Sequence, residues 1–445
     1  MVHCLIKNAQ IVNEGMIKTC DVEILSGRIE KIAADIQPKN NIEVIDAKGC
    51  YLLPGMIDDQ VHFREPGLTH KGDLKSESQA AIAGGITSFM DMPNTNPAIV
   101  TRIALQEKYQ MAATRNLNAN YGFYFGATND NWEEISQLKV GEACGVKVFM
   151  GASTGNLLVD KPEALEKIFE YCPLLIATHC EHSPTIQAQE HAFRTLYGEE
   201  VPIHFHADIR SRQACLLSST MAVGLARKYQ KRLHVLHLTT QDELSLFEAG
   251  PIFNKLITAE VCVHHLIFSR QDYAQKGMLI KCNPSIKEAS DRDALIQAVQ
   301  NDLIDIIATD HAPHTLAEKN QSYFKAPSGL PLVQHALLAL FELYHDQKLS
   351  LEKIVQKTSH AVADRFGIME RGYIREGYFA DLVLVDLHLS QIIDRETCLS
   401  KCGWSPFEGK KFRSSILKTW VNGVRVYEKG LDNSHCSAGQ RLIFV

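Results

Sequence analysis

Side chains able to bind metals or move protons stand at the ends of several apolar segments in this sequence. The densest group follows the apolar residues 306–308, where Asp310, His311 and His314 lie within five positions. A carboxylate and two imidazoles at one strand tip can bind a metal ion, and the carboxylate can accept a proton from metal-bound water. So dense a constellation favours a functional metal site over a purely structural role.

Another group lies within residues 54–67. Gln60 and His62 are two positions apart on an expected strand, so their side chains point to the same side, and Arg64 follows them. The guanidinium of Arg64 is a planar fork suited to a carboxylate. His62 taken alone is either a metal ligand or a structural histidine, and this segment does not decide between them.

Three further residues stand in or at the end of expected strands. Lys147 lies within the apolar residues 145–149, where a buried lysine is costly unless it is paired or chemically altered. It either points to solvent or carries CO2 as a carbamate whose oxygens bridge two metal ions. His179 and His237 each follow an apolar segment, and each is either a metal ligand or a capped loop residue.

The segments that must position these groups alternate between strand-like and helix-like from about residue 52 to about residue 351. Such alternation predicts parallel βαβ units, and about eight of them fit, as a closed (β/α)8 barrel of TIM type needs. Active sites of this architecture gather at the C-terminal strand ends, so the separate groups would meet in one pocket. An open, doubly wound sheet is the alternative. Expected strands cover residues 87–90, 121–125, 145–149, 174–178, 233–238, 257–263 and 304–308, and the clearest helices cover 75–83 and 209–229.

Both ends of the chain have a pattern of strands and turns. Residues 5–12 and 21–25 are strand-like and are followed by turn residues. Strand-like residues return at 380–385 and at 416–426, where Asn422 and Gly423 predict a turn. We predict an α/β fold in which residues 54–372 form the barrel. Residues 1–53 and 373–445 would together form a small β-sandwich domain.

The composition argues against several other classes of protein. Of the 445 residues, 45% are hydrophobic and 22% charged, and no apolar stretch reaches the roughly 18 residues needed to span a bilayer. The net charge of −6 and the lack of a long Lys/Arg run argue against nucleic-acid binding. The 12 cysteines are scattered, which suits a reducing cytosol, and Cys398 and Cys402 are expected one turn apart on an exposed helix without a function. We expect a cytoplasmic enzyme of small molecules.

Several segments resemble the amidohydrolase superfamily and, within it, the dihydroorotases. Residues 91–97, with the sequence Asp-Met-Pro-Asn-Thr-Asn-Pro, best separate dihydroorotases from hydantoinases and allantoinases. The same family is indicated by residues 62–67 and 308–314, and family segments are also found at 260–266 and 281–284. The resemblance continues to residues 377–383. It implies reversible hydrolysis of the ring amide of dihydroorotate to N-carbamoyl-aspartate, a step of pyrimidine biosynthesis. Because hydrolysis frees a carboxylate, ring closure should be favoured as the pH falls.

The resemblance also implies a metal centre. Two zinc ions would bind, a more buried one to His62 and Asp310 and a more exposed one to His179 and His237. The carbamate of Lys147 would bridge them. Asp310 would also carry a proton from the attacking water to the ring nitrogen.

The implied substrate site has two sides. Arg64, Asn94 and His314 would hold the substrate carboxylate, whereas Asn283 and the backbone near Ser328 and Gly329 would hold the ring amide. An unfilled cationic pocket is costly, so uncharged cyclic ureides would be disfavoured. The residues implied to line the substrate site are His62, Arg64, Asn94, Asn283, His314, Ser328 and Gly329.

Two positions depart from the family pattern. Gln60 stands where the superfamily usually has the first histidine of His-x-His, and an amide oxygen is a weaker zinc ligand than an imidazole. We therefore expect the buried zinc to bind more weakly, or the centre to hold one metal. Residues 284–287 read Pro-Ser-Ile-Lys in place of the more usual Pro-Pro-Leu-Arg, which leaves Asn283 in place but puts its neighbours' contacts in doubt.

Two other functions stay open. A catalytically silent, dihydroorotase-like subunit that scaffolds another pyrimidine enzyme would explain Gln60, but such a subunit has little reason to keep Lys147 and the other ligands. Another cyclic amidohydrolase, such as an allantoinase, is opposed by Arg64 and Asn94, which suit a carboxylate that allantoin lacks. The resemblance also suggests a homodimer.

Overall fold

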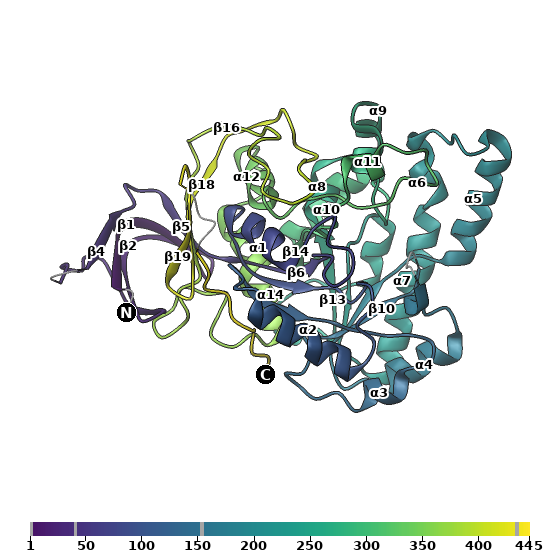
Figure 1. Cartoon of the computed structure of the whole chain (residues 1–445), viewed down its shortest axis with the longest axis horizontal. Coiled ribbons are helices and arrows are strands. Elements are labelled where there is room, and N and C mark those ends of the chain that lie inside the picture. Colours follow the sequence, from purple (N-terminus) through teal and green to yellow (C-terminus); the bar gives the residue numbers. More distant parts are fainter. Residues whose placement is uncertain (1–2, 40–41, 152–154, 432–435) are drawn as a thin grey trace.

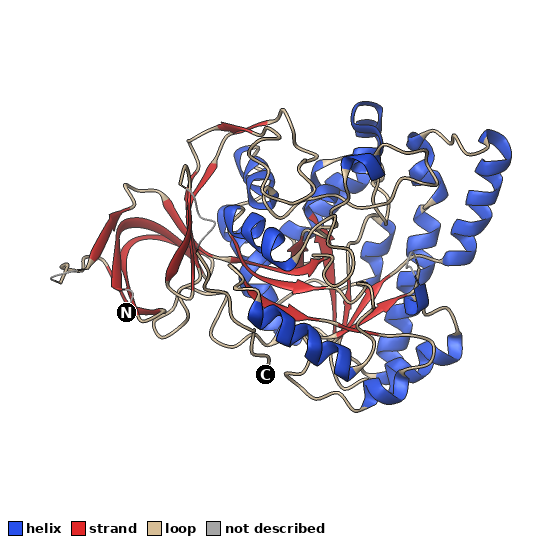
Figure 2. Cartoon of the chain, in the orientation of Figure 1, coloured by secondary structure: helices blue, strands red, loops and turns tan. Residues whose placement is uncertain are grey.

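A computed structural model of the chain describes residues 3–39, 42–151, 155–431 and 436–445. A β-rich part containing the first strands lies at one end of the molecule, and a larger part with parallel strands and surrounding helices lies at the other (Figures 1 and 2). The larger part is a (β/α)8 barrel, as predicted. The division of the chain into domains at residues 53/54 and 372/373 remains a prediction.

The barrel strands belong to two sheets, with the orders β6-β7-β8 and β14-β13-β12-β11-β10-β9. β8 and β9 are two parts of one strand interrupted at Tyr124, so the described residues contain eight barrel strands. The ring closes because Val61 pairs in parallel with His311, and the N–H of His62 donates to the carbonyl of His311 at 2.7 Å. This closure excludes an open sheet. The strands are β6 (Met56–Val61), β7 (Ile86–Asp91), β8 (Asn120–Phe123), β9 (Phe125–Gly126), β10 (Val146–Phe149), β11 (Ile176–His179), β12 (Leu233–Val235), β13 (Ile257–Cys262) and β14 (Ile306–Ala308).

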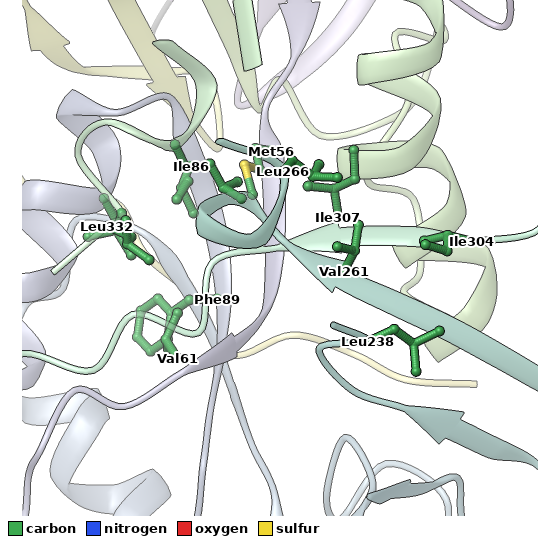
Figure 3. Close-up of a cluster of buried hydrophobic side chains, with 14 of the residues drawn as sticks. Met56, Val61, Ile86, Phe89, Leu238, Val261, Leu266, Ile304, Ile307 and Leu332 are labelled. Carbon is green, nitrogen blue, oxygen red and sulfur yellow. The ribbon is translucent and has the colours of Figure 1, made fainter. Parts of the chain in front are cut away.

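The barrel strands are apolar on both faces because helices cover them outside and packed side chains fill the inside. Every residue of β6, β7, β10 and β11 is buried. Figure 3 shows part of this core, where Val61 and Phe89 lie near each other and Val261 and Ile307 extend from neighbouring strands. The core therefore fixes the strand ends on which the polar groups stand.

Helices surround the barrel, with α5 and α7 forming its outermost edge (Figure 1). The first helix starts where Asp73 accepts a hydrogen bond from the N–H of Ser76, in a reciprocal capping box. The α-helices are α1 (Leu74–Ala83), α2 (Arg102–Thr114), α3 (Trp132–Ser136), α4 (Pro162–Tyr171), α5 (Ser183–Tyr197), α6 (His206–Ile209), α7 (Arg212–Tyr229), α8 (Val263–Ile267), α9 (Tyr273–Lys276), α10 (Ala289–Gln300), α11 (Leu316–Lys319), α12 (Ala336–His345), α13 (Leu351–Val355) and α14 (Ala361–Phe366).

The β-rich part combines strands from both ends of the chain in one mixed sheet. Its path is β19-β18-β15-β5-β1-β2-β3, and β4 pairs with β1. The last ten residues run instead along the barrel, where the N–H of Leu442 donates to the carbonyl of Tyr121 at 2.8 Å. The strands are β1 (His3–Asn13), β2 (Met16–Leu25), β3 (Arg28–Ala33), β4 (Glu43–Asp46), β5 (Tyr51–Pro54), β15 (Leu382–Asp386), β18 (Ser415–Val421) and β19 (Val424–Glu428), and a separate hairpin pairs β16 (Gln391–Ile392) with β17 (Lys411–Phe412).

The helix expected at 209–229 is confirmed over Arg212–Tyr229 and starts three residues later, because Ser211 caps it by accepting from the N–H of Ala214. One local prediction was wrong. Cys398 and Cys402 lie in turns and not on a helix. There the carboxylate of Asp394 accepts the N–H of Thr397, a local turn that competes with helix formation.

None of the helices in the described part of the chain has the length and apolar character that crossing a membrane requires.

A buried ion pair between α2 and β7 supports the first strand end. Lys108 Nζ lies 2.5 Å from Asp91 Oδ2, and both side chains are at most 1% exposed. The other oxygen of Asp91 accepts the N–H of Phe63 at 2.8 Å, directly before Arg64. The pair therefore anchors the backbone that leads into the site.

Replacing Lys108 by Met should lower the free energy of unfolding by about 3–5 kcal/mol, because it leaves the Asp91 carboxylate buried without its cation. Urea unfolding of the purified protein measures this change. The same replacement at the exposed Lys139 is the control and should change stability by less than about 0.5 kcal/mol. Equal stability of the two variants would contradict a structural role for the pair.

Candidate active site

A small polar pocket of ≈ 90 Å³ lies at the C-terminal ends of the barrel strands. Residues from eight separate stretches of the chain meet there, as strand ends of a barrel should. Of the residues predicted for the site, all but His314 line the pocket. The lining residues are Gln60, His62, Arg64, Asn94, Lys147, Phe149, His179, His237, Asn283, Asp310, Ala312, Ser328 and Gly329.

His62 is oriented by a contact on each ring nitrogen. Its Nδ1 lies 2.7 Å from Asn94 Oδ1, and its Nε2 lies 3.0 Å from Asp310 Oδ1. With the proton on Nδ1, the Nε2 lone pair faces a carboxylate oxygen. Two acceptors this close need a proton or a cation between them. His62 and Asp310 are thus arranged as a metal-binding pair would be.

His179 and His237 form a second pair, with ring centroids 4.6 Å apart. His179 Nε2 lies 2.9 Å from Glu181 Oε2, which leaves Nδ1 as the nitrogen available to a metal. His237 Nε2 is buried without a hydrogen-bond partner in the described residues. Burial lowers the pKa of both imidazoles below the ordinary value, so both are neutral, the form that binds metals. A carboxylate on the outer nitrogen of a ligating histidine is common at zinc sites.

Lys147 is fully buried in β10. Its Nζ lies over the ring of Phe149, 4.7 Å from the ring centroid. Burial lowers the pKa of Lys147 to about 8, although nearby carboxylates raise it in part. A largely desolvated amine of this kind is nucleophilic toward CO2, which makes carbamate formation chemically reasonable.

Asp310 is held from two sides. Besides His62, the amide of Gln60 donates to Asp310 Oδ1 at 3.2 Å. Burial raises the pKa of Asp310, but the contact with His62 and the nearby Lys147 outweigh this effect, so the pKa lies below its ordinary value and the carboxyl group is ionised. Gln60 therefore contacts the predicted catalytic carboxylate directly, which the sequence did not predict.

Arg64 and His314 form a cationic corner of the pocket. Arg64 Nη2 lies 3.0 Å from His314 Nε2, and its Nε donates to the carbonyl of Pro313 at 3.1 Å. Burial lowers the pKa of His314 far below the ordinary range, and the cations of Arg64 and Lys71 lower it further. His314 is therefore neutral and lies behind Arg64, whose guanidinium supplies the charge.

The loop that carries Ser328 and Gly329 forms the opposite wall. The hydroxyl of Ser328 donates to Asn283 Oδ1 at 3.0 Å. Gly329 has φ of 143°, and a Cβ there would lie 2.4 Å from the carbonyl oxygen of Ala312, so only glycine fits. The buried Lys319 Nζ donates to the carbonyls of Lys281, Pro327 and Gly329, each at 3.0 Å, and thereby fixes the loop.

Three residues of the site have left-handed backbone. Arg64, His237 and Asp310 have φ of 70°, 41° and 50°. Such conformations are uncommon for residues with a side chain and are concentrated at functional sites. Each of the three follows a barrel strand, where the left-handed conformation bends the chain and the side chain lines or adjoins the pocket.

Sequence reasoning missed the ionic contacts beneath the pocket. Arg210 Nη1 lies 2.6 Å from Glu181 Oε2 and so orients the partner of His179. Deeper in the barrel, His234 Nε2 lies 3.1 Å from Asp59 Oδ2 and 3.5 Å from Glu260 Oε2. Burial lowers the pKa of His234, but the two carboxylates raise it to about 9, so His234 is an imidazolium between carboxylates. Carboxylates such as Asp59 and Glu260, placed inside expected apolar strands, could have revealed these ionic contacts in the sequence. The buried Lys319 could not have been found in this way, because its neighbours in the sequence suggest an exposed helix.

Comparisons with known proteins agree with this geometry. The sequence model of the amidohydrolase family matches residues 51–426. A dihydroorotase of Methanosarcina acetivorans is 32% identical over 414 residues, which cover 91% of this chain and 88% of that protein. An allantoinase of Bacillus velezensis is 29% identical over 96% of this chain and 94% of that protein. The structure of an L-hydantoinase (dihydropyrimidinase) from Arthrobacter aurescens superposes with a TM-score of 0.91 over the whole of both chains, at 26% identity.

Proposed function

Because the chain belongs to the amidohydrolase family and is a hydrolase that acts on cyclic amides, we propose that it is a dihydroorotase. It would hydrolyse the ring amide of dihydroorotate to give N-carbamoyl-aspartate, and it would catalyse the reverse ring closure. The reaction would be a step of pyrimidine biosynthesis. The observation that carries the proposal is the position of Arg64 in the same small pocket as Lys147, His179, His237 and Asp310. A cyclic amide that carries a carboxylate can contact Arg64 with the carboxylate and the proposed metal ligands' side of the pocket with its ring at the same time.

The donor set fits zinc. Two ions would be held by the available nitrogens of His62, His179 and His237, the carboxylate of Asp310 and a carbamate on Lys147. Gln60 would add no ligand to the buried ion, because its amide nitrogen donates to Asp310. When bound, such ions lower the pKa of water and polarise the amide carbonyl.

The protein's own groups would orient the substrate and move the proton. Arg64, supported by His314, would bind the carboxylate, and the amide nitrogen of Asn94 is available beside it, since its oxygen is taken by His62. The ionised Asp310 would accept a proton from the attacking water and pass it to the ring nitrogen as the C–N bond breaks. Asn283 and the loop at Ser328 would hold the ring amide.

Arg64 also distinguishes dihydroorotase activity from the main alternative, an allantoinase. The allantoinase relative is 29% identical, close to the 32% of the dihydroorotase relative, so overall identity does not distinguish the two substrates. Allantoin has no carboxylate to neutralise Arg64, and leaving a buried cation unpaired costs affinity. Arg64 is 7% exposed, and its guanidinium contacts the carbonyl of Pro313 and the ring of His314, neither of which is a carboxylate. Arg64 therefore favours dihydroorotate.

The test is hydrolysis of dihydroorotate by the purified protein, followed by ring absorbance, before and after zinc removal and return. Allantoin and hydantoin are assayed in parallel. We expect activity with dihydroorotate that disappears with the metal and returns with it. Preference for allantoin or hydantoin would refute the substrate assignment. A folded protein inactive at every zinc concentration would instead support the silent scaffold, and Gln60→His would then be the first variant to test.

A further inference from the structure

A second group of metal-binding side chains lies where β13 meets α8. Cys262 ends the strand, and His264 and His265 lie in the first turn of the helix. One ligand atom from each lies within 4.8 Å of the other two. All three residues are at most 3% exposed. They line no part of the pocket described above.

The two imidazoles lack the hydrogen bonds that their burial requires. Both ring nitrogens of His264 and the Nδ1 of His265 are buried without a partner in the described residues. His265 Nε2, by contrast, lies 3.2 Å from the carbonyl of Pro284. A buried polar atom without a partner costs roughly 1–3 kcal/mol, so three together need an explanation. A metal ion on one nitrogen of each ring would satisfy two of the three.

The chemistry of the group suits a borderline or soft cation. A thiolate and two imidazoles are typical zinc ligands, and carboxylate-preferring ions such as magnesium are disfavoured by them. Cys262 Sγ also lies 3.7 Å from Gln60 Oε1. Sulfur and oxygen bound to one tetrahedral zinc, at roughly 2.3 and 2.1 Å, are about 3.6 Å apart, so Gln60 could complete the site.

Gln60 then lies between two cation positions. Its amide nitrogen donates to Asp310, on the side of the active-site pocket, whereas its oxygen faces Cys262. An amide can serve both sides because it has a donor end and an acceptor end. Glu260 Oε1, 3.5 Å from Cys262 Sγ, adds negative charge near the cation.

We propose that Cys262, His264 and His265, with the side-chain oxygen of Gln60, bind one further divalent metal ion of the zinc type. Binding releases the Cys262 thiol proton to solvent, and no other bond changes. The site does not depend on the substrate assigned to the enzyme. The role of this metal ion would be structural, because its ligands come from the end of β13 and the start of α8 and the ion would fix the turn between them.

Cobalt(II) is the probe, because a cysteine ligand gives a sulfur-to-cobalt charge-transfer band in the near ultraviolet. The proposed catalytic ligands contain no sulfur, so that band reports only a thiolate site. The full-length protein is stripped of metal and titrated with cobalt, and bound cobalt per chain is measured in parallel. We expect the band in the wild type and its loss, with one fewer cobalt per chain, in Cys262→Ser. Cys172→Ser, at another fully buried thiol, is the matched control and should keep both.

A folded wild-type protein that binds cobalt without the band would overturn the proposal, even if every variant were unstable. Retention of band and stoichiometry in Cys262→Ser would overturn it as well. His264→Gln should lose the same cobalt while Cys262 remains, which separates loss of the site from loss of the thiol alone. Because activity is not a readout, failure of the dihydroorotase assignment would leave these results unchanged.

Discussion

Lys147→Ala should lose bound zinc and dihydroorotate hydrolysis together. The ammonium form of Lys147 would repel the cations, so only a carbamate makes a fully buried lysine useful at this place. Metal-ion stabilisation of a transition state is worth several kcal/mol, and each ~1.4 kcal/mol is tenfold in rate, so kcat/KM should fall roughly a thousand-fold or more. Metal content and steady-state kinetics measure the two losses.

Chemical rescue makes this test specific. A short carboxylic acid such as acetate can enter the space left by the side chain and supply the two missing oxygens. It should restore part of both the zinc and the activity of Lys147→Ala. Acetamide has the same size without the charge and is the matched control, which should restore neither. Full activity of the variant without any acid would end the carbamate hypothesis, whatever the acid does.

The geometry of neighbouring residues explains which atoms remain for the metals. Asn94 and Glu181 each occupy one nitrogen of a histidine, and what remains is Nε2 on His62 and Nδ1 on His179. Arg210 holds Glu181 in turn. The residues around the proposed ligands thus select ligand atoms before any ion binds, which lowers the reorganisation that binding requires.

The sequence allowed the barrel to be predicted because apolar strands buried on both faces leave a clear pattern. Polar groups at successive parallel strand ends must converge, and this predicted that His62, Lys147, His179, His237 and Asp310 lie together. The other predicted pocket residues, Asn94, Asn283, Ser328 and Gly329, followed only from the family resemblance. What could not be predicted depends on contacts between distant residues. Gln60 meets both Asp310 and Cys262, which are more than 200 positions away, and only the closed ring brings them together. The hydrogen bond from Lys319 to the carbonyl of Gly329 could not be predicted for another reason, because nothing in the local sequence distinguishes a buried lysine from an exposed one.

Cys398 and Cys402 illustrate the weakness of spacing alone. Their separation of four suits one helical turn, but Asp394 offers its carboxylate to the N–H of Thr397, and the segment forms turns. By contrast, the positive φ at Arg64, His237 and Asp310 is set by the bend that follows a strand in a closed barrel. Local propensity does not encode it, because tertiary packing compensates for the strain.

Arg64→Met should change which ring the enzyme accepts. Removing one partner of a buried, hydrogen-bonded charge pair costs about 2–5 kcal/mol, which is roughly a 30- to 5,000-fold loss in kcat/KM for dihydroorotate. Dihydrouracil has the same ring without the carboxylate, so it makes no contact with the guanidinium that could be lost. Its kcat/KM should stay within a few-fold of the wild-type value, and the ratio of the two substrates should move toward dihydrouracil.

Arg64→Lys separates charge from shape. It keeps the cation but loses the planar fork and the bond from Nε to Pro313, so its loss with dihydroorotate should lie between those of the wild type and Arg64→Met. Zinc content should be unchanged in both variants, because Arg64 contacts none of the proposed ligands. Equal losses with dihydroorotate and dihydrouracil would mean that Arg64 supports the pocket as a whole, and the carboxylate preference would then need another origin. A selective loss would instead assign substrate choice to this one side chain, held in its left-handed turn behind the first barrel strand.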